Sequence, residues 1–198
     1  MNIVQQALQR DWEKLHPFIR KHYTLITGET QSDQLTGVMT IDFPTYIKPL
    51  LLGGRLFGAL INRKGSQIQA TVQKYTLPDS PWLFWKRELV FADGFVARFS
   101  SKMCYLQENE IIEYVRFGLG LRLKVSVGDD GSLVMTSNGY RWNLGVFTLP
   151  LPDWLFLGTA HIVERPLDES SFELDFTLQH PVLGQTYRYG GVFRDGVL

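Results

Sequence analysis

Residues 171–179 read SFELDFTLQ, and apolar and polar side chains alternate along this stretch. Successive side chains of a β-strand point to opposite faces of its sheet, so this spacing predicts a strand with one apolar and one polar face. Residues 121–127, LRLKVSV, alternate in the same way. Such strands are typical of an antiparallel sheet that packs one face on a core and exposes the other to water.

Short turn-like segments separate further strands, for example DG at 93–94, EN at 108–109 and DDG at 129–131. Connections this short exclude parallel pairing, which needs long crossovers. The predicted strands are 35–43, 67–76, 81–91, 95–106, 110–117, 119–127, 131–142, 155–164, 171–179 and 184–194. Large sheets curl or close. We therefore predict an α+β, mainly β fold: a strongly curved antiparallel sheet or barrel of about nine strands, with N-terminal helices packed on it.

The N-terminal segment has the spacing of a helix. Its apolar stripe is interrupted by Pro17, which is well tolerated only in the first turn of a helix. We expect a helix over 2–15 and a second from Pro17 to Tyr23, with His16 as its cap or as the hinge. The stripe consists of Leu8, Trp12, Leu15 and Ile19.

Two later segments break the strand pattern. Residues 28–34, GETQSDQ, are polar and predict a loop, while 44–61 are rich in proline and glycine. One or two short helices over 44–61 would form a lid on the opening of the curved sheet.

Length and charge restrict the class of protein. The 198 residues suffice for one domain with a buried core, and without a linker or repeat we expect a single domain over 1–198. The 20 basic and 20 acidic residues give a formal net charge of zero. This balance argues against a nucleic-acid partner, since such binding needs an excess of cations.

Cys104 is the only cysteine, which excludes an intramolecular disulfide and a zinc site built on cysteines. Its neighbours Met103 and Tyr105 predict a buried structural thiol. The four histidines form neither an HxH nor an HxxxH pair, so we expect no metal and no cofactor.

The first residues, MNIVQQALQRDWEK, lack the basic start and apolar stretch of a secretory signal. The most apolar segment, PLLLGGRLFGALI at 49–61, is shorter than the ~20 residues needed to cross a bilayer. We expect a cytoplasmic protein without a membrane span. The oligomeric state stays open.

A charged residue interrupts the apolar stretch PWLFWKRELVF at 81–91. In a strand, Arg87 shares a face with Trp85 and Leu89. A guanidinium on an apolar face must be paired, because an unpaired buried charge is costly. Glu113 shares its own face with apolar residues in IIEYVRFG, which makes it the candidate partner.

Three further residues are candidates for the interior. His161 shares a face with Leu157, Thr159 and Val163, and Tyr187 and Tyr189 share one in HPVLGQTYRYGGVF. Gly190–Gly191 in the same stretch indicates a bulge or a close approach of two backbones. No nucleophile elbow or phosphate-binding glycine pattern is present, so no residue is assigned as catalytic.

Six short motifs occur in an order and spacing that resemble one bacterial family, the domain of unknown function numbered 4166. They are LHPFIR (15–20), WKREL (85–89), RFSS (98–101), IIEYV (111–115), LPLP (149–152) and HPVLGQTYRYGG (180–191). The resemblance implies an arginine at Arg87, a glutamate at Glu113 and a His-Pro pair at His16–Pro17, but no established activity. Members are also fused to saccharopine-dehydrogenase-like domains, whose nucleotide fingerprint this chain lacks, so we do not expect NAD binding.

Three functions follow as hypotheses. The first is binding of an apolar or amphipathic small molecule in the cavity of the curved sheet, with Arg87, Glu113, His161, Trp85, Tyr187 and Tyr189 as candidate ligand-binding residues. The second is an enzyme acting on a lipid-like or aromatic substrate, in which Arg87 orients an anionic group and Glu113 or His161 transfers a proton. The third is a protein-interaction module that docks through 49–61, with Leu51, Leu52 and Phe57 exposed.

Overall fold

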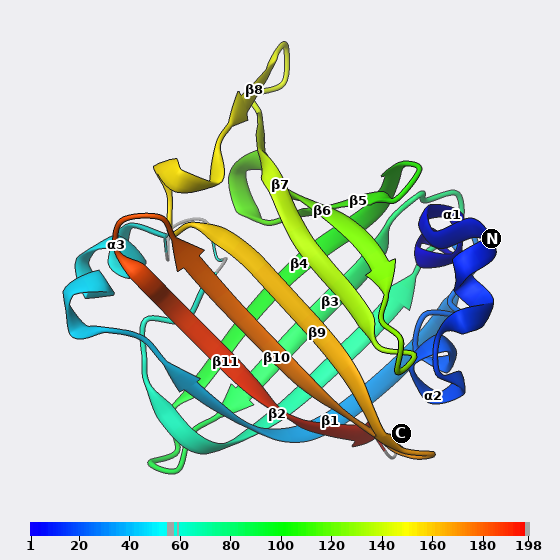
Figure 1. Cartoon of the computed structure of the whole chain (residues 1–198), viewed down its shortest axis with the longest axis horizontal. Helices are drawn as coiled ribbons and strands as arrows, with labels where there is room; N and C mark the ends of the chain where they lie inside the picture. Colours follow the sequence, from blue (N-terminus) through cyan, green and yellow to red (C-terminus); the bar gives the residue numbers. More distant parts are fainter. Residues whose placement is uncertain (55–57, 59, 197–198) are drawn as a thin grey trace.

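The computed structural model describes residues 1–54, 58 and 60–196, and its centre is a closed antiparallel barrel (Figure 1). The sheet order is β6-β5-β4-β3-β2-β1-β11-β10-β9-β7-β8, and a further pairing of β6 with β7 closes ten of these strands into a ring. The strands are β1 Gln31–Asp42, β2 Gly65–Thr76, β3 Leu83–Val90, β4 Val96–Gln107, β5 Glu110–Tyr114, β6 Leu119–Val127, β7 Leu133–Asn143, β8 Thr148–Leu151, β9 Thr159–Asp168, β10 Ser171–His180 and β11 Gly184–Asp195.

The predicted antiparallel barrel is confirmed, with a corrected count of ten strands in the ring and one extra strand. The extra strand, β8, pairs only with the end of β7, as Tyr140 opposite Leu151 shows, and no prediction covered it. The predicted loop at 28–34 is wrong in its second half. Gln31 pairs with Thr76 and Gln34 with Gln73, so these polar residues begin strand β1.

The N-terminal segment caps one end of the barrel (Figure 1). The helix predicted over 2–15 is formed by α1 (Ile3–Leu8) and the 3₁₀ helix η1 (Gln9–Lys14). His16 caps the second helix, α2 (Pro17–Lys21), as expected: its Nδ1 accepts a hydrogen bond from the Phe18 N–H at 3.4 Å. The capped helices bury their apolar stripe against the barrel, including Leu8, Trp12, Leu15 and Ile19.

Short helices lie at the other end of the barrel, as predicted for 44–61. They are the 3₁₀ helix η2 (Thr45–Ile47) and α3 (Lys48–Gly54). The Tyr46 hydroxyl donates to the carbonyl of Leu183 at 2.8 Å, which fixes η2 to the turn between β10 and β11. Of the three leucine and phenylalanine residues expected to be exposed here, Leu52 is exposed, but Leu51 is fully buried because it packs into the core, and Phe57 lies outside the described part of the chain. Two further 3₁₀ helices, η4 (Arg116–Gly118) and η5 (Asp153–Leu155), adjoin this end and shorten the strands predicted at 110–117 and 155–164.

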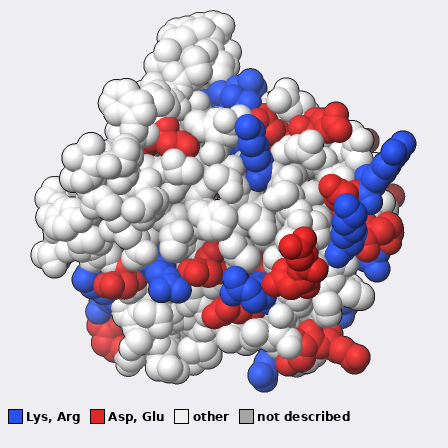
Figure 2. All heavy atoms as spheres, viewed as in Figure 1, with Lys and Arg blue, Asp and Glu red and all other residues white. Residues whose placement is uncertain are grey.

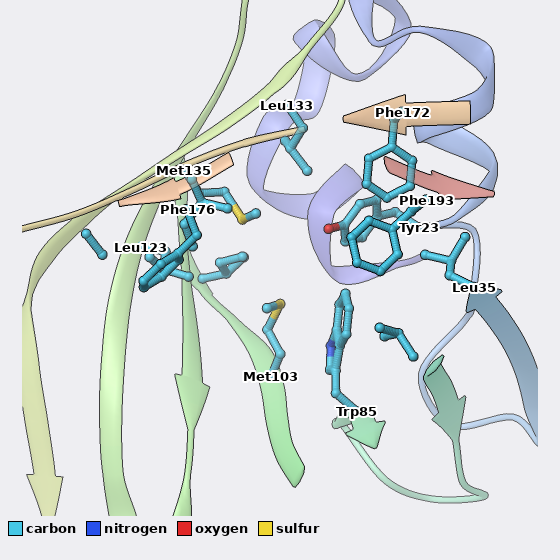
Figure 3. Packing of buried hydrophobic residues seen from close by; sticks show 14 of the residues in the cluster. Tyr23, Leu35, Trp85, Met103, Leu123, Leu133, Met135, Phe172, Phe176 and Phe193 are labelled. Atoms are coloured by element: carbon cyan, nitrogen blue, oxygen red, sulfur yellow. The ribbon is translucent and has the colours of Figure 1, made fainter. Parts of the chain in front are cut away.

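The alternation in 171–179 is borne out by burial. Phe172, Phe176 and Leu178 are buried inside the barrel and Leu174 is partly buried against the same core, whereas Glu173 and Asp175 on the opposite face are partly exposed. Figure 3 shows Phe172 and Phe176 converging with side chains from several other strands and from Tyr23 after α2. The core therefore lies inside the ring of strands.

Two glycines let the last strand approach both of its neighbours closely, as the sequence indicated. A β-carbon at Gly190 would lie 2.6 Å from the Leu174 carbonyl oxygen on β10, and one at Gly191 would meet the Val38 carbonyl oxygen on β1. Cys104 is half-buried rather than fully buried, and burial raises the pKa of its thiol. Among the described helices, none is both long and apolar enough to cross a membrane.

Candidate ligand-binding site

The barrel encloses a pocket between its two ends. Its volume is about 180 Å³, and it extends from Tyr23, below the N-terminal helices, to Leu60 and Ile61 at the end that carries α3. Inward-facing residues of many strands form a mainly apolar wall. They include Leu35, Met39, Val72, Leu89, Met103, Leu121, Leu123, Met135, Ile162, Phe176 and Leu178.

Arg87 faces this pocket and meets its predicted partner there. Its Nη2 lies 3.0 Å from Oε1 of Glu113, and its Nη1 donates to the Ser101 hydroxyl at 2.8 Å. Ser101 in turn donates to the same Glu113 oxygen. Both charged side chains are about one-sixth exposed, so the pair is largely withdrawn from water.

Two aromatic rings lie against the guanidinium. Its central carbon lies 4.7 Å from the ring centre of Trp85 and 5.3 Å from that of Phe99. Cation–π contacts of this kind are stronger when the cation is desolvated. Arg87 is thus fixed by an ion pair, a hydroxyl and two rings, at a position where β3, β4 and β5 lie side by side.

A second polar cluster lies toward the N-terminal helices. The Tyr23 hydroxyl donates to Oε1 of Glu164 at 2.8 Å, and burial raises the pKa of that carboxyl above its ordinary value. Lys74 is fully buried nearby: its Nζ donates to the His22 carbonyl at 2.6 Å and lies 4.8 Å from the Tyr23 ring centre. Burial lowers the pKa of the Lys74 ammonium. The interior therefore holds two cations and two carboxylates in close proximity.

Trp85 leaves one donor unused. Its side chain is 7% exposed, and its Nε1 has no hydrogen-bond partner among the residues that the structure describes. Figure 3 shows this nitrogen on the edge of the indole ring that faces Met103, another residue of the pocket wall. A buried donor without a partner costs about 1–3 kcal/mol, so this N–H is a position where a bound acceptor would be stabilised.

The two predicted tyrosines also lie on the pocket wall. The Tyr187 hydroxyl donates to the Ile61 carbonyl at 2.9 Å, which links β11 to the end of the pocket near α3. Tyr189 stacks on Phe176 with the ring centres 4.4 Å apart, and burial raises the pKa of Tyr189 to about 12. Both rings therefore contribute mainly apolar surface.

His161 is not part of this pocket, contrary to expectation. It pairs with Thr177 across β9 and β10, and Thr177 lies on the outward face that alternates with Phe176 and Leu178. The His161 side chain is exposed and contacts the Thr136 hydroxyl at 3.2 Å. Its neighbours Ala160 and Ile162 face the interior instead.

The sequence contained a signal for interior residues that were not predicted. Lys74 follows Ile68, Ala70 and Val72 at intervals of two, and Glu164 follows Ala160 and Ile162 in the same way. A charged residue on an apolar strand face is the same feature that identified Arg87. Ser101 and Tyr23 carried no such signal.

One group near the N-terminal helices has side chains of the kind that bind metals: His22, Asp33 and Asp195. His22 Nδ1 lies 2.9 Å from Asp33, but two lysines also approach these carboxylates, Lys74 at 3.4 Å and Lys21 at 2.8 Å. Cations already neutralise the group, so we interpret it as an ion-pair cluster that joins α2 to β1 and β11.

The fold and the pocket define a ten-stranded antiparallel barrel protein with an apolar interior pocket. Residues 15–193 match the family described as Domain of unknown function (DUF4166), and the chain belongs to this family. No curated protein matches it. The crystal structure of Rv2717c from M. tuberculosis is similar, with a TM-score of 0.50 and 12% identity, covering 92% of this chain and 99% of that one. A likeness at this identity shows a shared fold.

Proposed function

We propose that this protein binds an apolar or amphipathic small molecule in the pocket of its barrel. The observation that carries the proposal is the pocket itself, with an apolar wall and a few convergent polar groups. This combination is the usual form of a small-molecule site. Protein interiors are otherwise close-packed, and an apolar cavity of about 150 Å³ is enough to bind benzene.

The polar groups favour a ligand whose polar part is neutral. Arg87 is already paired with Glu113, so a ligand carboxylate would have to displace that partner. The free N–H of Trp85 suits a carbonyl, ether or hydroxyl oxygen. An apolar molecule bearing one such acceptor would make apolar contacts with the pocket wall and accept a hydrogen bond from the indole N–H.

Binding is better supported than catalysis. The enzymatic alternative needs a proton-transferring group beside Arg87, and His161 lies on the outer surface. Glu113 is within reach, but Arg87 and Ser101 already donate to it. Glu164, the other carboxyl of the pocket wall, likewise accepts a hydrogen bond from Tyr23, so both carboxyls already have partners.

Titration with prodan, a neutral naphthyl ketone whose emission shifts in apolar surroundings, tests the proposal. Leu121→Trp would fill the pocket, while Lys124→Trp introduces the same ring on the outer face of the same strand. We expect saturable one-to-one binding to the wild type and to Lys124→Trp, and loss of binding in Leu121→Trp. Equal binding to both variants, or none to the wild type, would refute the proposal.

A further inference from the structure

Exposed apolar side chains gather at the end of the barrel that carries α3 and β8. We call them the apolar end surface: Leu50 and Leu52 on α3, Val146 and Phe147 in the β7–β8 hairpin, Trp154 on η5 and Val182 in the β10–β11 turn. Figure 2, in the same view as Figure 1, shows the region of α3 and β8 almost free of charged residues. Val146 is 94% exposed, Val182 84% and Trp154 60%. Exposed apolar patches of this extent mark interaction sites.

The segments that bear this surface are held to one another. The His180 imidazole Nε2 lies 3.0 Å from the Trp154 carbonyl, which joins η5 to the β10–β11 turn. The same turn accepts a hydrogen bond from Tyr46, just before α3. These contacts join α3, η5 and the β10–β11 turn, while the β7–β8 hairpin with Val146 and Phe147 projects beyond them at the same end of the barrel (Figure 1).

Few charged residues lie around this surface, and two exposed ones, Lys48 and Arg116, are positive. Only two charged residues, Lys48 and Asp153, occur in the segments that bear this surface, which are 44–54, 144–158 and 180–185. Asp153 is partly withdrawn into the protein, where its Oδ2 accepts a hydrogen bond from Ser137 at 2.8 Å. Lys48 and Arg116 are exposed, and neither forms an ion pair within the described part of the chain. Exposed cations beside an apolar surface complement anionic lipid headgroups.

We propose that the apolar end surface docks onto a lipid bilayer that contains anionic lipids. The apolar side chains stand on separate projections, which a deformable bilayer accommodates more easily than a protein surface that needs matching hollows. Tryptophan is enriched at the membrane interface, and exposed cations at the same end of the barrel would face the headgroups. Leu60 and Ile61, which line the pocket, follow α3 at this same end. The inference does not depend on ligand binding, since the surface and the pocket are made of different residues.

Flotation of the full chain with lipid vesicles tests the inference. The vesicles are made of phosphatidylcholine alone or with phosphatidylglycerol. We expect the wild type to float with the mixed vesicles, and more weakly with phosphatidylcholine. Combining Val146→Ser, Phe147→Ser and Trp154→Ser should lower the partition coefficient about tenfold or more. Lys48→Glu with Arg116→Glu should remove the preference for phosphatidylglycerol, as should high salt.

The control replaces exposed leucines at the opposite end of the barrel, Leu77→Ser with Leu167→Ser, and should bind vesicles like the wild type. Circular dichroism checks that every variant is folded. Three results would overturn the inference: no flotation of the wild type, equal flotation of the Val146, Phe147 and Trp154 variant, or equal loss in the control. Wild-type self-association that the same three substitutions abolish, in the absence of vesicle binding, would assign the surface to a second copy of the chain.

Discussion

Arg87 and Glu113 meet inside the barrel with Nη2 and Oε1 3.0 Å apart, although they belong to strands separated by β4. Ser101 on β4 bridges them, because its hydroxyl contacts both side chains. The pair therefore joins three neighbouring strands through side chains on the pocket wall. The ion pair should therefore affect both the stability of the barrel and the polarity of the pocket.

Removing one member of the pair should destabilise the protein strongly. Glu113→Leu leaves the Arg87 cation unpaired in an apolar setting, and we expect a loss of roughly 3 kcal/mol in the free energy of unfolding. The double variant Arg87→Met/Glu113→Leu should be the more stable of the two, because no buried charge is left alone. Urea unfolding measures the free energy of unfolding of the single and the double variant. The exposed pair Arg98–Glu88 is the control, where Arg98→Met should change stability by about 0.5 kcal/mol at most. A double variant less stable than Glu113→Leu would contradict the account.

Glu164 should make stability depend on pH in a defined direction. Burial raises the pKa of this carboxyl above its ordinary value of 4.5, so the folded state holds the proton more tightly than the unfolded state. Its contribution to stability is full below pH 4.5 and declines as the pH rises through the raised pKa. Glu164→Gln cannot ionise, so it should gain stability relative to the wild type over this range. Urea unfolding at several pH values tests this, and parallel curves for the two proteins would rule it out.

The close approach of β11 to β1 should forbid a side chain at Gly191. A methyl group there would collide with the Val38 carbonyl oxygen and with Met39, which are parts of a paired strand and cannot move away cheaply. We expect Gly191→Ala to lower the free energy of unfolding by about 2 kcal/mol or more. Gly53→Ala on α3 is the matched control, because nothing lies within 4 Å of the added carbon. Similar costs for both substitutions would show that the β1–β11 contact is less tight than described.

The free indole donor should contribute to ligand affinity. Trp85→Phe removes the unpaired N–H from the pocket wall, and we expect prodan affinity to fall about tenfold, the value of one hydrogen bond to a buried donor. Trp82→Phe is the control, since Trp82 packs against Lys102 and Tyr114 outside the pocket wall. Unchanged affinity in Trp85→Phe would show that the indole donor does not contact the ligand.

Much of the barrel could be predicted from alternation alone. The face shared by Trp85, Arg87 and Leu89 is confirmed as an inner face. Its alternation could be predicted because β3 pairs with a strand on each side without a shift in register. β8 could not be predicted, because Thr148–Leu151 pairs at the margin of the sheet, where most of its side chains stay exposed. Such a strand has no buried face to impose a pattern on its sequence.

The site was predicted in part, and the failures have a physical cause. The prediction for His161 relied on Leu157, which precedes β9 and therefore does not report on the alternation of its side chains. The pairing of Ile162 with Phe176 decides which face is inward, and this depends on a partner strand that one strand's sequence does not contain. Lys74 and Glu164 become recognisable only when a charged residue on an apolar face is read as buried rather than exposed. Their stabilising contacts come from α2 and the segment that follows it, far away in the chain.

Native mass spectrometry of gently purified protein tests the central claim, that the barrel interior binds a small molecule, most directly. We expect a one-to-one complex, either with a co-purified molecule or with added prodan, above the bare mass of 22.7 kDa. The complex should be absent in Leu121→Trp and retained in Lys124→Trp. A wild-type protein that shows only its bare mass, both as purified and in the presence of saturating prodan, would contradict the claim.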